Sequence, residues 1–125
     1  MNVVDSSAWL EYFADGPNAG YFSKAIEKPT ELVVPTLSLY EVFKQVLLQR
    51  NEGDALQVVA VMQQGIVVDL TDTIALSAAR ISIDHRIPMA DSVILATARS
   101  WKATLWTQDS DFEGIAGVRY VEKKQ

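Results

Sequence analysis

Asn2-Val3-Val4-Asp5-Ser6-Ser7, near the start of the chain, shows the pattern from which the fold follows: a short apolar run, a carboxylate, then residues that favour a helix start. The pattern recurs. Leu32-Val33-Val34-Pro35 precedes a helix-like segment that carries Glu41, and Thr104-Leu105-Trp106-Thr107 precedes Asp109. Strands alternating with helices predict an α/β domain with a parallel sheet and helices on both of its faces.

The whole chain divides into such units. We expect strands at 3–4, 31–34, 66–68, 104–107 and 118–121. We expect helices that carry 9–13, 21–26, about 38–47, 55–64, 74–81 and 93–98. Pro29 and Gly65 are expected to end the second and fourth helices, while Thr71 and Pro88 are expected to begin the last two. Because no repeat, low-complexity segment or linker interrupts this order, residues 1–125 are predicted to form a single domain.

The composition is that of an ordinary globular protein. Hydrophobic residues make up 49% of the 125 residues, and there is no cysteine, which excludes disulfides, zinc–thiolate sites and a cysteine nucleophile. The N-terminus lacks the basic region of a signal peptide. The longest apolar runs have about five residues, far fewer than the roughly 20 that span a bilayer. We therefore expect a cytoplasmic protein without a membrane segment.

The chain is acidic, with a net charge of −5 and a pI of about 4.7. Taken alone, this charge argues against nonspecific binding to a nucleic-acid duplex, which needs a basic face. However, two bound divalent cations would bring the net charge to −1. A nucleic-acid substrate therefore stays possible if metal ions, rather than Lys and Arg, meet its phosphates.

Four carboxylates are expected at one edge of the sheet. Asp5, Glu41 and Asp109 follow strands, and Asp91 lies in the first turn of the apolar helix that Pro88 begins. The carboxyl ends of parallel strands share one edge, where open α/β sheets bind ligands. Four acids crowded there would repel one another unless a cation held them. The pattern therefore predicts a hard-metal site, of the kind that often performs phosphate chemistry.

Each acid also has a purely structural explanation. Asp5 suits a helix N-cap, and Ser38-Leu39-Tyr40-Glu41 matches the capping box, Ser-x-x-Glu. Asp91 would be favoured by the helix dipole, and Asp109-Ser110-Asp111-Phe112 suits a turn with Asx hydrogen bonds. The joint placement of the four acids is harder to explain in this way. The single histidine, His85, is expected on the surface, without a metal or general-base role.

Four motifs in the same order resemble those of the PIN-domain family, and within it the VapC-type toxins of toxin–antitoxin pairs. They are Val4-Asp5-Ser6-Ser7-Ala8-Trp9-Leu10, Ser38-Leu39-Tyr40-Glu41-Val42, Met89-Ala90-Asp91-Ser92-Val93-Ile94-Leu95-Ala96-Thr97-Ala98 and Leu105-Trp106-Thr107-Gln108-Asp109-Ser110-Asp111-Phe112. Each motif is weak alone, but together they cover essentially the whole chain. The resemblance implies a three-layer α/β/α fold whose five-stranded parallel sheet has the order 3-2-1-4-5.

The resemblance also implies a function: a Mg²⁺- or Mn²⁺-dependent endoribonuclease that acts as the toxin of a type II pair. It implies a homodimer, a cognate antitoxin and a structured RNA substrate, transfer RNA among the candidates. By motif position, the catalytic acids are Asp5, Glu41, Asp91 and Asp109. Asp5 and Asp91 are expected to be direct metal ligands. Ser6 and Thr107 are expected to be supporting groups, and Asp111 an auxiliary acid.

Other classes of function make different demands on the sequence. The rival is a catalytically silent PIN-like module whose acids are structural and whose role is to hold a protein partner. Phosphatases of the haloacid-dehalogenase type need Asp-x-Asp after the first strand, where this chain has Asp5-Ser6-Ser7. Receiver domains need a Lys where Thr107-Gln108 stands. Neither the phosphatase nor the receiver domain fits the chain.

Overall fold

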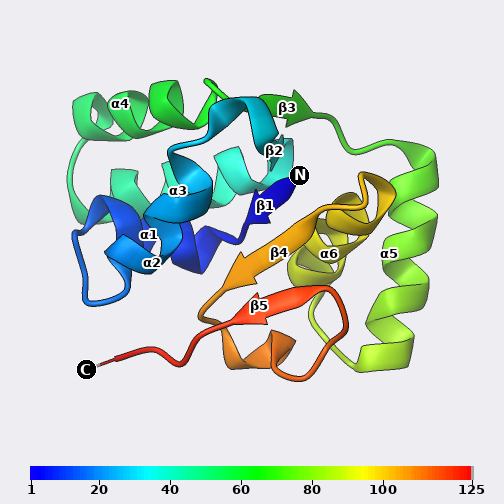
Figure 1. The fold of residues 1–125 in the computed structure, drawn as a ribbon. Coiled ribbons are helices and arrows are strands. Elements are labelled where there is room, and N and C mark those ends of the chain that lie inside the picture. The colour runs from blue at the N-terminus through cyan, green and yellow to red at the C-terminus, as the bar shows by residue number, and fades with distance from the viewer. Residues whose placement is uncertain (125) are drawn as a thin grey trace.

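The sheet has five parallel strands. A computed structural model describes residues 1–124 and contains β1 (Asn2–Val4), β2 (Leu32–Pro35), β3 (Ile66–Val68), β4 (Thr104–Thr107) and β5 (Val118–Tyr120). They lie in the order β3-β2-β1-β4-β5, and every neighbouring pair is parallel. In Figure 1 the arrowheads of β1, β4 and β5 point the same way. The predicted fold class and strand order are therefore confirmed.

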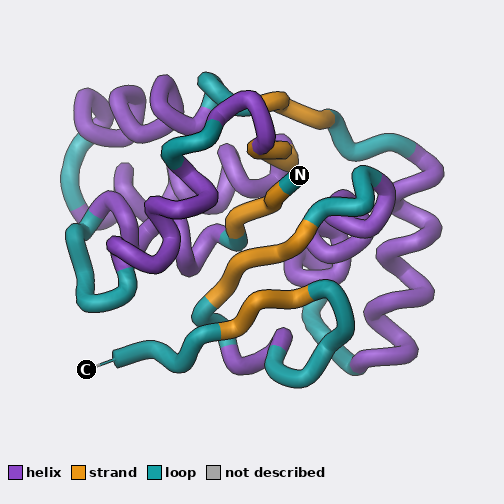
Figure 2. The backbone as a smooth tube through the Cα atoms, viewed as in Figure 1, coloured by secondary structure: helices purple, strands orange, loops and turns teal. Residues whose placement is uncertain are grey.

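Six α-helices of the described chain connect and cover the strands (Figure 2). They are α1 (Ser6–Phe13), α2 (Ala19–Ile26), α3 (Thr36–Gln49), α4 (Glu52–Met62), α5 (Asp72–His85) and α6 (Met89–Ser100). Two short 3₁₀ turns, η1 (Pro29–Glu31) and η2 (Ser110–Phe112), precede β2 and follow β4. Within residues 1–124, no helix is both long and apolar enough to cross a membrane.

The alternation of side chains along each strand divides the core into two layers. Val3 and Val33 belong to the cluster beneath α5 and α6, whereas Val4 and Val34 belong to the cluster beneath α1, α2, α3 and α4. All four valines are fully buried. Burying one such side chain is worth about 1.5–3 kcal/mol, so the two layers hold the sheet between the helices, as Figure 1 shows.

The expectations that Pro29 and Gly65 end helices are wrong. Helix α2 ends at Ile26, three residues before Pro29, which instead begins η1. Helix α4 ends at Met62, three residues before Gly65. A Cβ atom at Gly65 would lie 2.9 Å from the Leu32 carbonyl oxygen and 2.9 Å from Val34 Cγ2. Glycine therefore stands at this position because the chain passes close to β2 as it enters β3.

Candidate metal centre

The carboxyl edge of the sheet gathers the predicted acids from separate elements. Asp5 follows β1, and Asp109 follows β4. Helix α6 precedes β4 and runs back across the sheet, so its first turn, which carries Asp91, lies at this same edge. Residues 92–98 of α6 are all buried, which holds this turn firmly in place. Elements far apart in the sequence thus deliver three of the predicted acids to one place.

Three carboxylates form the tightest group. One oxygen each from Asp91, Asp109 and Asp111 lies within 4.8 Å of the other two. The backbone N–H of Asp111 donates to Asp109 Oδ1 at 2.9 Å, so the predicted Asx turn is present alongside the cluster. Three carboxylate oxygens at this spacing are a donor set that suits Mg²⁺ or Mn²⁺.

Asp5 lies beside this group and is 3% exposed. Its Oδ2 accepts hydrogen bonds from Ser7 Oγ at 2.7 Å and from Thr107 Oγ1 at 2.9 Å. Asp5 occupies the N-cap position of α1, but in the described chain its side chain makes no capping hydrogen bond. The hydroxyl of Ser7, in the first turn of α1, and the hydroxyl of Thr107, at the end of β4, hold its carboxylate at the sheet edge.

Thr107 connects the first and fourth strand ends. Its side chain is fully buried; the hydroxyl donates to Asp5 and accepts from the backbone N–H of Asp109 at 2.9 Å. One hydroxyl thereby fixes a carboxylate after β1 against the loop after β4. This contact is consistent with the supporting role predicted for Thr107.

The structure excludes the structural alternative considered for Glu41, a capping box with Ser38. Helix α3 begins at Thr36, so Ser38 is not its N-cap, and the capping-box alternative is wrong. The reason is that Pro35, the last residue of β2, already takes the N-cap position, and the helix starts two residues earlier than expected. Ser38 Oγ is buried and has no hydrogen-bond partner among the described residues.

Glu41 Oε1 accepts a hydrogen bond of 2.6 Å from Ser6 Oγ, across 35 residues of sequence. The neighbouring hydroxyl, Ser7, donates to Asp5 instead. Successive helical residues are about 100° apart around the axis, which explains why the two serines face different acids. Ser7 was not among the predicted site residues, although the Asp5-Ser6-Ser7 motif contains it.

Burial and mutual repulsion raise the pKa of two of these carboxyl groups, Asp5 and Asp91. Burial raises the pKa of Asp5 above its usual value, against the lowering effect of hydrogen bonds from Ser7 and Thr107. Burial first, and then the negative charges of Asp5, Asp109 and Asp111, raise the pKa of Asp91 to about 7. A divalent cation would reverse this balance, because its positive charge favours the ionised carboxylates.

Two buried amides next to the acids were not predicted. Asn18 Nδ2 donates to Gln108 Oε1 at 3.0 Å and to the Glu122 carbonyl oxygen at 3.1 Å. Both Asn18 and Gln108 are buried polar residues. Gln108 lies in a predicted motif, but Asn18 lies in the Asp-Gly-Pro-Asn break, where an ordinary turn explains it equally well. His85 is exposed at the end of α5, as expected.

An open parallel sheet with carboxylates collected at its carboxyl edge places the chain among α/β proteins with an acidic, oxygen-rich site. The model of the PIN domain matches residues 3–118, and the chain belongs to the PIN-domain family. The comparison with curated proteins gave no match.

Solved structures of toxin–antitoxin proteins share this fold. A toxin–antitoxin complex from Klebsiella pneumoniae is 19% identical, with a TM-score of 0.80, covering 95% of this chain and 96% of that one. VapC20 from Mycobacterium tuberculosis, described as a sarcin–ricin loop cleaving toxin, is 17% identical with a TM-score of 0.76, covering 93% and 95%. DNA-bound VapBC from Salmonella typhimurium is 16% identical with a TM-score of 0.74, covering 98% of both chains. Because these proteins are only 16–19% identical to this chain, the structural similarity establishes the shared fold and nothing further.

Proposed function

We propose that this PIN domain is the toxin of a type II toxin–antitoxin pair and acts as a Mg²⁺- or Mn²⁺-dependent endoribonuclease. The observation that carries the proposal is the convergence of Asp91, Asp109 and Asp111, next to Asp5, at one edge of the sheet. The description of VapC20 as a toxin that cleaves the sarcin–ricin loop supports a structured RNA as the substrate. Such an enzyme would meet its RNA in the cytoplasm.

In this proposal Asp5 and Asp91 hold the cation, and Glu41 and Asp109 complete the catalytic acids. Asp111 is the auxiliary acid and, from its distance to Asp91 and Asp109, a further candidate ligand. A bound Mg²⁺ would supply a water of lowered pKa and a positive charge beside the scissile phosphate. The role of the protein is to orient these carboxylates, through the hydroxyls of Ser7 and Thr107 for Asp5 and of Ser6 for Glu41.

The proposed partner is a cognate antitoxin. A groove of about 940 Å³ between α1, α3 and α4 has a mixed lining: apolar side chains that include Leu10, Phe13 and Val58, and polar or charged ones that include Glu11 and Arg50. The groove also reaches Ser7 and Gln108, so a peptide lying in it would cover the entrance to the acidic edge. That geometry suits an inhibitor that blocks the site.

A silent binding module is the second candidate. The hydroxyls that contact Asp5 and Glu41, and the Asx turn at Asp109, already give these acids structural partners without a cation. Response to metal separates the two functions. The nuclease should gain thermal stability from Mn²⁺ and cleave RNA, whereas the silent module should do neither.

The test compares Asp91→Asn with Asp84→Asn, which removes the same charge from an exposed position on α5. We expect Asp91→Asn to remain folded by circular dichroism but to lose cleavage of total RNA by at least about 100-fold, together with the Mn²⁺-induced rise in Tm. Asp84→Asn should keep both. Sequencing the 5′ ends of the fragments would identify the RNA. Full Mn²⁺-dependent cleavage by purified Asp91→Asn would rule out the proposed role of Asp91.

A further inference from the structure

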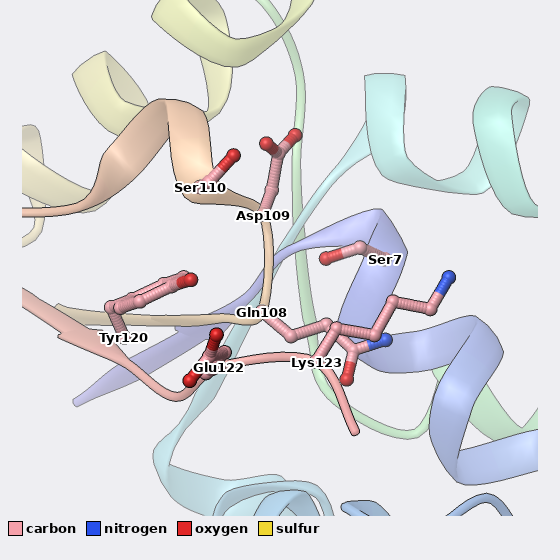
Figure 3. Close-up of a pocket in the computed structure, with 7 residues that line it drawn as sticks. All are labelled: Ser7, Gln108, Asp109, Ser110, Tyr120, Glu122 and Lys123. Atoms are coloured by element: carbon pink, nitrogen blue, oxygen red, sulfur yellow. The ribbon is translucent and has the colours of Figure 1, made fainter. Parts of the chain in front are cut away.

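A second recess adjoins the acidic edge. It has a volume of about 430 Å³ and shares Asp109 with the candidate metal centre (Figure 3). Its lining side chains come from the start of α1, the loop after β4, and the end of β5 with the segment that follows. They are Ser7, Gln108, Asp109, Ser110, Tyr120, Glu122 and Lys123. Figure 3 shows these residues surrounding a common open space.

One wall of the recess is held in place by a buried residue. Asn18, which is 2% exposed, donates from one amide nitrogen to both the Glu122 carbonyl and the Gln108 side chain. The backbone N–H of Val121 also donates to the Thr107 carbonyl at 3.0 Å. The segment after β5 is thus attached to the loop that carries Asp109, and its side chains keep a defined position relative to the acids.

The lining combines an aromatic ring, an amide and two hydroxyls with two carboxylates, Asp109 and Glu122, and one ammonium group. Tyr120 offers an aromatic ring, Gln108 an amide, and Ser7 and Ser110 two hydroxyls. As far as the described residues extend, Lys123 is the lining residue with a positive charge. The Glu122 carboxylate makes the Tyr120 end unfavourable for an anion. A phosphate therefore belongs at the Lys123 side, and a base belongs against Tyr120.

We propose that this recess binds one unpaired nucleotide of the RNA adjacent to the cleaved phosphodiester, with its base on Tyr120 and its phosphate near Lys123. This inference rests on the proposed ribonuclease function. It specifies that the substrate is single-stranded where it enters the site, because only an unpaired base exposes a face for stacking on an aromatic ring.

The test measures RNA binding without cleavage. The unsubstituted protein with Mg²⁺ is titrated into a fluorescein-labelled, mixed-sequence RNA decanucleotide whose linkages are phosphorothioates to resist cleavage, and fluorescence anisotropy gives the Kd. We expect Tyr120→Ala to raise the Kd on the order of tenfold, and Tyr120→Phe to leave it nearly unchanged, because stacking needs the ring and not the hydroxyl. We expect Lys123→Ala to raise the Kd several-fold, whereas Lys124→Ala, which removes the same charge one residue away, should not.

Tm values of all variants establish that each is folded. Equal Kd values for the parent, Tyr120→Ala and Lys123→Ala proteins would overturn the subsite, as would a failure of the parent to bind the decanucleotide. The proposed function is judged separately, from cleavage by the unsubstituted protein with Mn²⁺. If the unsubstituted protein cleaves RNA but neither Tyr120→Ala nor Lys123→Ala changes the Kd, the subsite is rejected and the nuclease function is kept. If Tyr120→Ala raises the Kd but the unsubstituted protein does not cleave RNA, the subsite is kept and the nuclease function is rejected.

Discussion

Asp91 is the residue whose chemistry depends most on its neighbours. Its pKa is raised to about 7 by burial and by the negative charges of Asp5, Asp109 and Asp111. A carboxyl group with this pKa is partly protonated at neutral pH. A hard cation bound beside it would lower the pKa and favour the ionised carboxylate. The same side chain therefore links the charge of the site, the stability of the fold and the affinity for metal.

This coupling predicts a pH-dependent stability in EDTA. The pKa of Asp91 is about 7 in the folded protein and 3.8 in its ordinary state. Between these two pH values the folded protein therefore binds more protons at this group than the unfolded chain does. The free energy of unfolding should therefore be highest at the acidic end of this window and fall as the pH rises toward about 7. Asp5, whose pKa is also raised, acts in the same direction.

Urea denaturation at several pH values between about 5 and 7.5 measures the effect. Asp91→Asn should show a shallower decline than the unsubstituted protein, because one of the titrating groups is gone, while Asp84→Asn should retain the full decline. Equal slopes for Asp91→Asn and the unsubstituted protein would contradict the assignment of the titration to Asp91.

The site depends on where particular helices and strands begin and end, because these boundaries place the acids. Strand β1 ends at Val4, directly before Asp5, and β4 ends at Thr107, two residues before Asp109. Helix α6 begins at the same edge of the sheet and carries Asp91 in its first turn. Helix α3 begins at Thr36, which places Glu41 beyond the first turn and opposite Ser6. Small shifts of an element boundary decide which partner an acid meets.

The passage from α4 into β3 should be sensitive to a single methyl group. Gly65→Ala would place Cβ against the Leu32 carbonyl and the Val34 side chain, and we expect it to lower the free energy of unfolding by about 1–3 kcal/mol. Gly20→Ala is the matched control: it lies in α2, and beyond its chain neighbours and the nearby backbone of its own helix, no described atom lies within 4 Å of the position that its new Cβ would take. Gly20→Ala should raise stability by about 0.5–1 kcal/mol.

Urea midpoints at constant m-value distinguish the two glycine variants. If Gly65→Ala proved as stable as the unsubstituted protein, close approach to β2 would not be the reason for glycine at this position.

The molecule as a whole is an acidic protein that we propose acts on a polyanion and pairs with itself. Helix α5 exposes Leu76 and Ile83, at 75% and 77% of their surface, seven residues apart on one helical face. Two large apolar side chains so aligned suit a symmetric contact between two copies. The homodimer that the family resemblance implies would cover them.

Replacing one of these side chains should therefore disrupt the dimer. We expect the unsubstituted protein to have twice the mass of one chain by light scattering after size exclusion, and Leu76→Glu to shift it toward the monomer. Ser77→Glu adds the same charge at the next, also exposed, residue of α5 and should leave the dimer intact. A monomeric unsubstituted protein, or a Leu76→Glu dimer, would exclude this face as the interface.

The α/β class, the number of strands and the motifs that carry the acids could all be predicted from the sequence. These depend on local patterns: apolar runs of strand length, helical periodicity and the residues that begin and end helices. The strand order came from the resemblance of four motifs to a family. Boundaries were predicted less accurately where two residues competed for one role, as Pro35 and Ser38 did for the start of α3.

Which side chains meet is a property of the packed structure alone. Ser6 reaches Glu41, Thr107 bridges Asp5 to Asp109, and Asn18 attaches Gln108 to the segment after β5. These partners are up to 104 residues apart in the sequence. Contacts of this kind depend on how whole elements pack against one another, and no local pattern around Asn18 or Ser7 contains that information.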